Sequence, residues 1–574
     1  MDVQTLATAL AINEKRKADL VAAEYDSSRT YALGALVLYK GALYECTTQI
    51  TTAEAWNPDH WTQRTIEYYL AQIGTEYPRL GVSGVGGSSA TLTRLWDAVG
   101  LVTPTPGTDA VTCSSAFDQF KPFNRKKCVG HWSLDTASAT PKAKFTVEAY
   151  YGDADYAEDG TMGDYVAVEI EPFYYFEGGG MLGVSEHQFP GWKIHPVCVD
   201  LDGNIRAKTY IPCYAMGLKD GKPVSLPGYH NEFGGYKALV DKAKLYGDGS
   251  LDHCAILEPS AVDHYEWLLM TIEYATQNMQ TVMQGAVSMA YTANDKIHAV
   301  PDDNKIVVTA AIGDKYVVGQ SIVIDASYSV TPSSVAAYNI ILSIDKCDED
   351  GTLNASGTYR LITYDGTDRS ASIVADTTQL GSKPWISGAT QGAAPGVGAV
   401  RGHTGSPVSN SNSKYPNLYR WRENVYGNQN MTCMDLFDVR VEDEDTYHLD
   451  WYFLKDPRLF YPYANSAASD LVAAKGFVKL GVTTPASSYA DGYIKELGAD
   501  PLYPHVHVPV LTSGGSASTY YCDYAYLVSS HVVRSVRRRG TLSYGASSGP
   551  CSVNALTAPS LSSWSFGGGL FFIQ

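Results

Sequence analysis

Short apolar runs typical of β-strands recur along the chain and are separated by loop-like stretches. The run Tyr165–Ile170 predicts a buried strand. Four runs between residues 302 and 376 (KIVVTAAI, YVVGQSIVIDA, AYNIILSID and YRLITYD) predict the short strands of an all-β insertion. His264–Ala275 has the best helical pattern, because apolar residues such as Leu268 and Ile272 recur at helical spacing. Together these patterns predict an α+β fold.

Residues 1–90 divide into three short regions. Residues 1–22 predict an amphipathic helix for docking or oligomerisation. In residues 23–66, two strand-like runs flank the turn at Lys40 and predict a small β module. Residues 67–90 end in a run of Gly and Ser that lacks the Lys-Ser/Thr of a phosphate loop, so they predict a linker.

A larger body follows and is interrupted once. Residues 91–301 form its first part, and the all-β insertion spans 302–376. Residues 377–414 are rich in Gly and Ser and predict a long surface loop. Aromatic-rich strand patterns resume over 415–574. Because one hydrophobic core rarely exceeds about 300 residues, the chain is predicted to be multidomain.

The last stretch, Thr541–Gln574, contains no Asp, Glu, Lys or Arg, although these residues make up 18% of the chain. Small polar residues replace the charges, with larger anchors such as Tyr544 and Trp564. This mixture is typical of a surface that contacts a partner. A solvated tail has a similar composition, but Leu570–Ile573 predicts a buried strand. We therefore expect a folded segment rich in loops.

Composition narrows the function classes. The net charge of −18 argues against nucleic acid as the main partner, and the 41 Tyr suit interfaces and sugar-contacting faces. No run approaches the ~20 apolar residues of a membrane span, and the N-terminus lacks the apolar region of a signal peptide. The ten Cys show no metal-ligand spacing, so buried reduced thiols are predicted.

Residues 23–66 resemble the small carbohydrate-binding modules of chitinases and of their relatives in phage fibre proteins. The resemblance lies in Tyr31, Gly34, Val37, the run Tyr39–Cys46 and the closing Trp56-Asn-Pro58 and Trp61. It implies that exposed aromatic side chains stack on sugar rings. Tyr44, Trp56 and Trp61 are the candidates for glycan stacking. The alternative, that they form the core of so small a domain, is favoured.

The body resembles a family of phage tail receptor-binding proteins. The segments that carry the resemblance follow the family's order, and Arg-x-x-Glu-Asn is their most specific motif. They are Tyr150–Asp153, Val166–Tyr175, Phe189–Pro196, Trp267–Gln280, Tyr419–Asn428, Gly514–Asp523 and Gly540–Leu570. The resemblance implies a C-terminal module with the C-type lectin fold, in the variant shared with formylglycine-generating enzymes and retroelement-diversified tropism determinants. Gln429 and Asn430 depart from the family, which usually has Ile-Trp there.

The resemblance also implies a ligand-binding face at the C-terminus. In diversified relatives, Asn-type codons vary while certain glycines and a closing Trp stay fixed. Gly545, Gly549, Pro550, Trp564 and Gly567 would be the fixed scaffold here. Codons are not visible in an amino-acid sequence, so diversification is a hypothesis. The residues that fit the variable alphabet and are predicted to bind the ligand are Ser543, Tyr544, Ser547, Cys551, Ser552, Asn554, Leu556, Thr557, Ser560, Ser563 and Ser565.

The partners that the resemblance implies belong to a virion. The protein is expected at a tail or fibre tip, is made in the host cytoplasm, and binds a bacterial surface receptor that is a glycan or a protein. Other phage tail or virion proteins and a homotrimeric assembly are also expected. Neither a cofactor, nor nucleic acid, nor membrane insertion is expected.

The candidate chemical groups favour binding over catalysis. Cys522 and Cys551 lie where formylglycine-generating enzymes have their active-site cysteines, but their surroundings do not match. Glu258-Pro-Ser260 is a poor match to the calcium motif of sugar-binding lectins. The acidic run Glu442–Asp445 could hold a structural cation, although a solvated turn is favoured. No catalytic residue and no metal ligand are therefore assigned.

Two further groups keep alternatives open. His505 and His507 share one face of a predicted strand and would be half of a metal site, but the sequence positions no third ligand, so a structural role is favoured. Arg537–Arg539 could meet an anionic receptor, with burial beside carboxylates as the alternative.

A polysaccharide-degrading tail enzyme is an alternative function, since glycosidase carboxylates are paired in space rather than in sequence. A purely structural role as a decoration protein of the tail or capsid is a second alternative.

Overall fold

The computed structural model describes residues 24–40, 42–64, 78–106, 115–135, 142–247, 254–287, 295–325, 336–366, 372–400, 404–406, 413–442, 447–457, 476–485, 491–527 and 533–572. Over these residues it has strands β1 to β35, and its α-helices are α3 (Tyr236–Lys244), α4 (Ser260–Tyr274) and α5 (Ala310–Gly313). The predicted α+β class is therefore wrong, and the fold is β-rich. The physical reason is that β-branched and aromatic residues dominate most of the apolar runs. The helix predicted over 1–22 lies outside the described residues.

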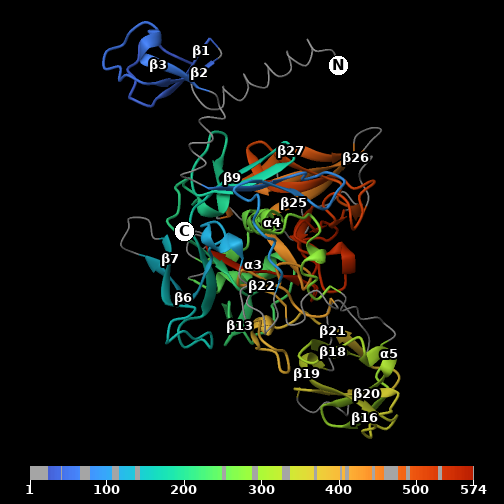
Figure 1. Cartoon of the computed structure of the whole chain (residues 1–574). Helices are drawn as coiled ribbons and strands as arrows, with labels where there is room; N and C mark the ends of the chain where they lie inside the picture. The colour runs from blue at the N-terminus through green and yellow to red at the C-terminus, as the bar shows by residue number, and fades with distance from the viewer. Residues whose placement is uncertain are drawn as a thin grey trace.

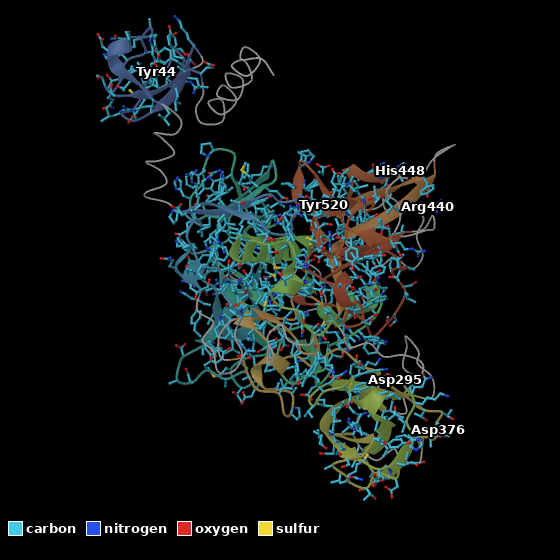
Figure 2. The ribbon with its side chains drawn as sticks, turned by 45° about the vertical axis from the view of Figure 1, so that its right-hand side comes forward. Tyr44, Asp295, Asp376, Arg440, His448 and Tyr520 are labelled. Atoms are coloured by element: carbon cyan, nitrogen blue, oxygen red, sulfur yellow. The ribbon has the colours of Figure 1, made fainter. Side chains whose placement is uncertain are left out.

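The N-terminal module is an antiparallel sheet in the order β1-β2-β3, and it lies apart from the rest of the chain (Figure 1). Its elements are β1 (Leu36–Tyr39), β2 (Ala42–Cys46), the 3-10 helix η1 (Pro58–His60) and β3 (Trp61–Arg64). The two predicted strand runs correspond to β1 and β2, which confirms the hairpin. Figure 2 shows Tyr44 on this module.

The first part of the body contains a five-stranded sheet, a four-stranded sheet and a hairpin. The five-stranded sheet has the order β11-β9-β10-β4-β5 and the four-stranded sheet the order β12-β8-β6-β7. Their strands are β4 (Arg79–Ser83), β5 (Thr93–Trp96), β6 (Lys126–Asp135), β7 (Lys142–Tyr150), β8 (Tyr165–Ile170), β9 (Tyr174–Gly178), β10 (Met181–Ser185), β11 (Lys193–Ile194) and β12 (Thr209–Pro212), and the hairpin is β13 (Gly217–Lys219) with β14 (Lys222–Val224). The 3-10 helices η2 (Ala116–Gln119), η3 (Pro196–Cys198) and η4 (Met279–Thr281) join this part.

The second part of the body is built on an eight-stranded sheet. Its order is β27-β26-β25-β32-β33-β31-β28, with β34 paired to β25. The strands are β25 (Asn430–Glu442), β26 (Tyr447–Leu454), β27 (Phe477–Pro485), β28 (Gly492–Tyr493), β31 (Tyr524–Tyr526), β32 (Arg534–Arg538), β33 (Val553–Asn554) and β34 (Phe566–Gly567). Smaller sheets are β22 (Thr404–Gly405) with β23 (Leu418–Tyr419) and β24 (Arg422–Glu423), and β29 (Glu496–Asp500) with β30 (Tyr503–Leu511).

One hydrophobic core joins the two parts of the body. Its buried residues run from Leu80 to Phe572 and include most of α4. The predicted helical pattern over His264–Ala275 is confirmed, although α4 begins at Ser260. The last strand, β35 (Leu570–Phe572), pairs with β15 (Ala255–Leu257) directly before α4. The C-terminal end of the described chain is therefore part of the core.

A six-stranded sheet forms a separate unit in the order β16-β17-β20-β19-β18-β21, at the lower right of Figure 1. Its strands are β16 (Ala299–Asp302), β17 (Lys305–Thr309), β18 (Ser321–Asp325), β19 (Ala336–Cys347), β20 (Tyr359–Tyr364) and β21 (Gln379–Ser382), and α5 follows β17. Its core is its own, and includes Ile306, Ile341 and Ile362. Figure 2 shows Asp295 and Asp376 on this unit.

Two stretches predicted to be flexible or exposed are packed instead. Residues 67–90 were expected to be a linker, but Arg79–Ser83 is β4, which lies between β10 and β5. Residues 377–414 were expected to be a surface loop, but residues 381–390 are buried throughout. Trp385 is the reason, because it packs in a core cluster with Trp564. Gly and Ser are compatible with close packing as well as with solvent.

Buried arginine–carboxylate pairs surround α4. Glu266 accepts two hydrogen bonds from Arg125, at 3.0 and 2.7 Å, and one from Arg422 at 2.9 Å. Arg422 also donates to Glu258 at 2.6 Å. About two helical turns further along α4, Arg420 donates to Glu273 at 2.7 and 2.5 Å. Although burial alone raises the pKa of Glu266 and Glu273, their arginine partners hold each pKa below its usual value.

Replacing Arg420 by Met is expected to destabilise the body by about 3–5 kcal/mol, because the buried Glu273 carboxylate then lacks its guanidinium. Urea unfolding followed by tryptophan fluorescence measures the loss. Arg360→Met is the matched control, since its partner Asp314 is 59% exposed and the pair should contribute at most about 1 kcal/mol. Equal losses in the two variants would contradict a special role for the buried network.

Candidate functional site

The N-terminal module is built around stacked aromatic rings. Trp56 stacks on Tyr39 with ring centroids 3.8 Å apart and on Trp61 at 5.3 Å. Tyr44 meets the ring of Trp56 edge-on at 4.8 Å, and Tyr25 meets the same ring from another direction at 5.0 Å. The cluster therefore fixes the orientation of every ring in it.

The three predicted glycan-stacking residues differ in exposure. Trp61 is 5% exposed and packs with Val37 and Cys46 in the core of the module. Tyr44 and Trp56 are half-buried. Trp61 is thus a core residue. Trp56 is half-buried but stacks on both Tyr39 and Trp61, so the half-buried Tyr44 is the better candidate of the two for a sugar ring.

The C-terminal segment begins and ends at one place in the body. At its start, the Arg539 guanidinium forms an ion pair with the buried Glu258 carboxylate. At its end, strand pairing places Leu570 opposite Leu257. Because neighbouring residues hold both ends, residues 541–569 form one long segment that is closed at its base. We call it the loop, although it contributes the short strands β33 and β34 to the eight-stranded sheet.

Close packing fixes the middle of this loop. A Cβ atom on Gly549 would overlap the Asp523 carboxylate, and one on Gly567 would overlap the Gln429 side chain. The Gln429 amide also donates to the carbonyl of the buried Trp564 at 2.9 Å. Gln429, which departs from the family pattern, therefore holds the closing Trp in place.

The predicted ligand-binding residues fall into three classes of exposure. Ser543, Leu556 and Ser560 are exposed, and Tyr544, Ser547, Thr557 and Ser565 are half-buried. Cys551, Ser552, Asn554 and Ser563 are buried. We call the seven residues of the first two classes together the C-terminal face. The buried class lies beneath it.

The buried side chains support the loop from within. The Ser552 hydroxyl donates to the Ser547 carbonyl at 2.7 Å. The Asn554 amide donates to the Tyr544 hydroxyl at 2.8 Å. These bonds close within the segment, whereas the Cys551 amide donates to the Asp523 carboxylate and Arg537 donates to the Thr557 hydroxyl from outside it.

A row of four tyrosines continues the C-terminal face. Ring centroids lie 5.1 Å apart for Tyr493 and Tyr524, 4.6 Å for Tyr524 and Tyr526, and 4.7 Å for Tyr526 and Tyr544. All four are half-buried. The sequence analysis named only Tyr544. The alternation Tyr-Ala-Tyr at 524–526 was the available signal, since Ala525 is buried and its neighbours face the other way.

The three tandem arginines divide between two environments. Arg539 pairs with Glu258 and also with Asp263 at 2.7 Å, as the carboxylate alternative expects. Arg537 is buried with its guanidinium 3.7 Å above the Phe566 ring, and burial lowers its pKa to about 9. None of the three is exposed, so they support the loop from beneath rather than meet a receptor.

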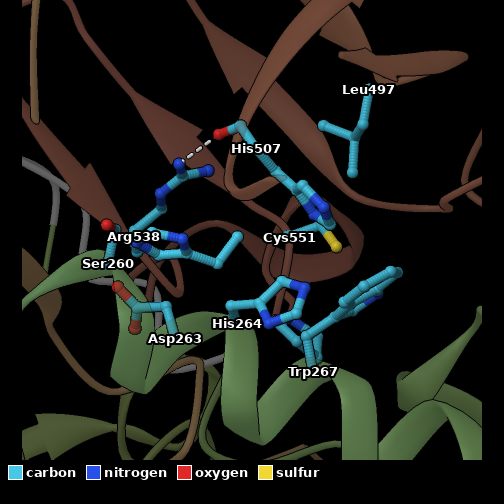
Figure 3. Close-up of a pocket in the computed structure, with 10 residues that line it drawn as sticks. Ser260, Asp263, His264, Trp267, Leu497, His507, Arg538 and Cys551 are labelled. Atoms are coloured by element: carbon cyan, nitrogen blue, oxygen red, sulfur yellow. Dashed lines mark hydrogen bonds between the residues drawn. The ribbon is translucent and has the colours of Figure 1, made fainter. Parts of the chain in front are cut away.

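The histidine pair meets a third group from a distant strand. His505 and His507 both lie on β30 and line a small cavity (Figure 3). The possible ligand atoms of Glu177, His264 and His507 all lie within 4.8 Å of one another. Sequence reasoning missed Glu177 because it is 330 residues from His507. The acidic run predicted as a cation site, 442–445, has its side chains outside the described residues.

The nine cysteines among the described residues are buried and form no disulfide. This confirms the prediction of reduced thiols for those nine. Burial raises the pKa of Cys522 to about 12. Its thiol is therefore not activated as a nucleophile at neutral pH.

Comparison with known proteins identifies one part of the chain. Residues 24–62 match carbohydrate-binding module family 5/12, which covers the N-terminal module and its aromatic cluster. The match confirms this part of the resemblance and indicates a carbohydrate ligand. The chain matches none of the curated proteins with which it was compared. Within the described residues, every helix is too short or too polar to cross a membrane.

Asp523→Asn should stabilise the body relative to the parent, by an amount that grows as the pH rises. Burial raises the pKa of Asp523 to about 8, against the effect of the hydrogen bond from the Cys551 amide. An unfolded Asp ionises near pH ~3.9, so ionisation of Asp523 opposes folding progressively between about pH 4 and pH 8. Asn keeps an acceptor for the Cys551 N–H and removes the charge.

Urea unfolding of the parent and the Asp523→Asn variant at about pH 5, 7 and 9 tests this expectation. The free energy of unfolding of the variant should exceed that of the parent by an amount that grows between about pH 4 and pH 8 and is constant at higher pH. A difference that does not change with pH would show that Asp523 ionises as it does in the unfolded chain.

Proposed function

We propose that this chain is a host-adhesion protein of a phage virion, which recognises a bacterial surface ligand through the C-terminal face. The main support is that a charge-free segment of the sequence is folded as a loop anchored at both ends, with small polar side chains outside. The family resemblance of the body supports the same proposal. The N-terminal module adds a second contact with carbohydrate.

The chemistry of the C-terminal face suits an uncharged ligand. Hydroxyl groups such as Ser543 and Ser560 offer donors and acceptors, and Leu556 adds apolar area. The tyrosine row adds rigid amphipathic rings at little entropic cost. This combination fits the hydroxyl-rich and apolar faces of a glycan, and it fits an exposed protein loop as well.

The proposal includes a homotrimer, in which several weak sites act together. Linked sites can raise the overall affinity by about 100-fold or more without a new contact. Light scattering of the purified protein tests the assembly.

Diversification of the C-terminal face by a retroelement is a further part of the proposal. A template repeat that differs at adenines, beside a reverse-transcriptase gene, would support that part, and its absence would remove it.

The proposed activity is binding without turnover. A polysaccharide-degrading enzyme would release product from host glycan, whereas an adhesin would bind cells saturably and release none. A purely structural decoration would leave host adsorption unchanged when it is deleted. Incubation of the purified protein with host surface polysaccharide, followed by analysis of soluble oligosaccharides, separates the first two.

Tyr44→Ala should weaken binding of the full chain to an insoluble polysaccharide such as chitin by about 10-fold or more, since a stacked ring contributes roughly 1–3 kcal/mol. A pull-down with increasing polysaccharide measures the affinity. Tyr151→Ala is the matched control, because Tyr151 is an exposed tyrosine on the body. Unchanged binding by Tyr44→Ala would exclude Tyr44 from the sugar contact, and cellulose in place of chitin tests the choice of glycan.

Ser543→Asp and Leu556→Asp should each abolish the ability of the purified protein to compete with phage for host cells. A new carboxylate on this uncharged surface must be desolvated on contact, which costs several kcal/mol. Plaque counts after pre-incubation of the cells with protein measure the competition. Leu502→Asp is the matched control, since Leu502 is 80% exposed outside the segment. If both segment variants still compete as well as the parent, the C-terminal face is not the binding surface.

A further inference from the structure

A cluster of histidines and one carboxylate lies between α4, β9 and β30. Glu177 on β9 has one carboxylate oxygen 3.1 Å from His264 Nε2 and the other 2.9 Å from His507 Nε2. The Glu177 side chain is 25% exposed, whereas His264 is buried. Three distant segments of the chain therefore bring two imidazoles to one carboxylate.

A further set of hydrogen bonds orients the side chains of this cluster. His195 Nδ1 accepts a hydrogen bond from the Val197 amide at 3.2 Å, so its proton lies on Nε2. His195 Nε2 then donates to His264 Nδ1 at 2.9 Å, and His264 Nε2 donates to Glu177. These hydrogen bonds join the three histidine and glutamate side chains in one chain, from His195 through His264 to Glu177.

The donor atoms of the cluster suit a cation. Carboxylate oxygens and imidazole nitrogens are the groups that bind divalent transition metals of the zinc type.

The space beside the ligands has the size of an ion or a water molecule. A cavity of about 20 Å³ is lined by His264, His507 and His505, with Trp267 as an apolar wall and Arg538 at another side. Glu177 is not among its lining residues, so the cavity adjoins two of the three proposed ligands. Figure 3 shows the rings of His264 and His507 converging on it from the helix and from the strand. About 10–15 Å³ is needed for one water, so an organic ligand is excluded while an ion with one water is not.

We propose that Glu177, His264 and His507 form a binding site for a divalent transition-metal ion of the zinc type, with a water molecule as the fourth ligand. Two histidines and one glutamate are a known zinc donor set. His264 must then move its proton to Nδ1 and donate it to His195, which gives up the 3.2 Å bond from Val197. The ion would cross-link α4, β9 and β30. This proposal is independent of the proposed function.

Zinc titration of the full chain tests the site after dialysis against a chelator. Calorimetry should show one tight site per chain, and zinc should raise the unfolding temperature. His507→Gln and Glu177→Gln should lose both effects. His195→Gln should bind about 10–100-fold more weakly, because it removes the group that orients a ligand. His131→Gln is the matched control, since His131 pairs with Glu148 on the surface.

Two outcomes would overturn the site. One is a parent protein that neither binds zinc stoichiometrically nor gains stability from it. The other is a pair of ligand variants that bind zinc as tightly as the parent. If the ligand variants do not fold, cobalt replaces zinc in the parent. Visible absorption bands of four-coordinate cobalt then support the site, and their absence excludes it.

Discussion

The body depends on burying carboxylates and guanidinium groups together around α4. Glu258, Glu266 and Glu273 are each almost fully buried, and each is paired with at least one arginine. Removing such charges from water costs several kcal/mol per ion, and only good geometry repays it. Their arginines come from three distant parts of the sequence, before β6, around β24 and after β32. Mispaired arrangements of these segments would leave a buried charge unpaired, so the network selects one arrangement of the chain.

The C-terminal face takes its position from this network. Glu258 holds Arg539 at the start of the loop, and its neighbour Leu257 pairs with Leu570 at the end. The loop therefore begins and ends on the core of the body. Its interior is fixed by close contacts, such as that of Gly549 with Asp523. A loop held in this way can change its outer side chains without changing its path.

Sequence patterns were informative wherever local periodicity decides the structure. The strand Tyr165–Ile170, the hairpin of the module and the helix around Leu268 each form from a short local run that is rich in apolar residues. The sequence patterns failed where contacts between residues far apart in the sequence determine the structure. The pairing of Arg420 with Glu273 spans 147 positions and follows no local pattern. Likewise, the tyrosine row is assembled from separate strands and a loop, so only one of its members was predicted.

The division between charged interior and uncharged face has a physical reason. A buried ionised group needs a partner of fixed position, and so neither member of a pair can be replaced alone. Several polar groups of the loop instead bond to one another, as Ser552 does to Ser547, and each such bond contributes only about 1 kcal/mol. Arg538 belongs to the interior, because it donates to the carbonyl of His507 beneath the loop (Figure 3). Charges and imidazoles thus form the permanent scaffold, while small neutral side chains form the surface on which substitutions cost least. A face that must adapt to its ligand is therefore best placed where this chain has no charge at all.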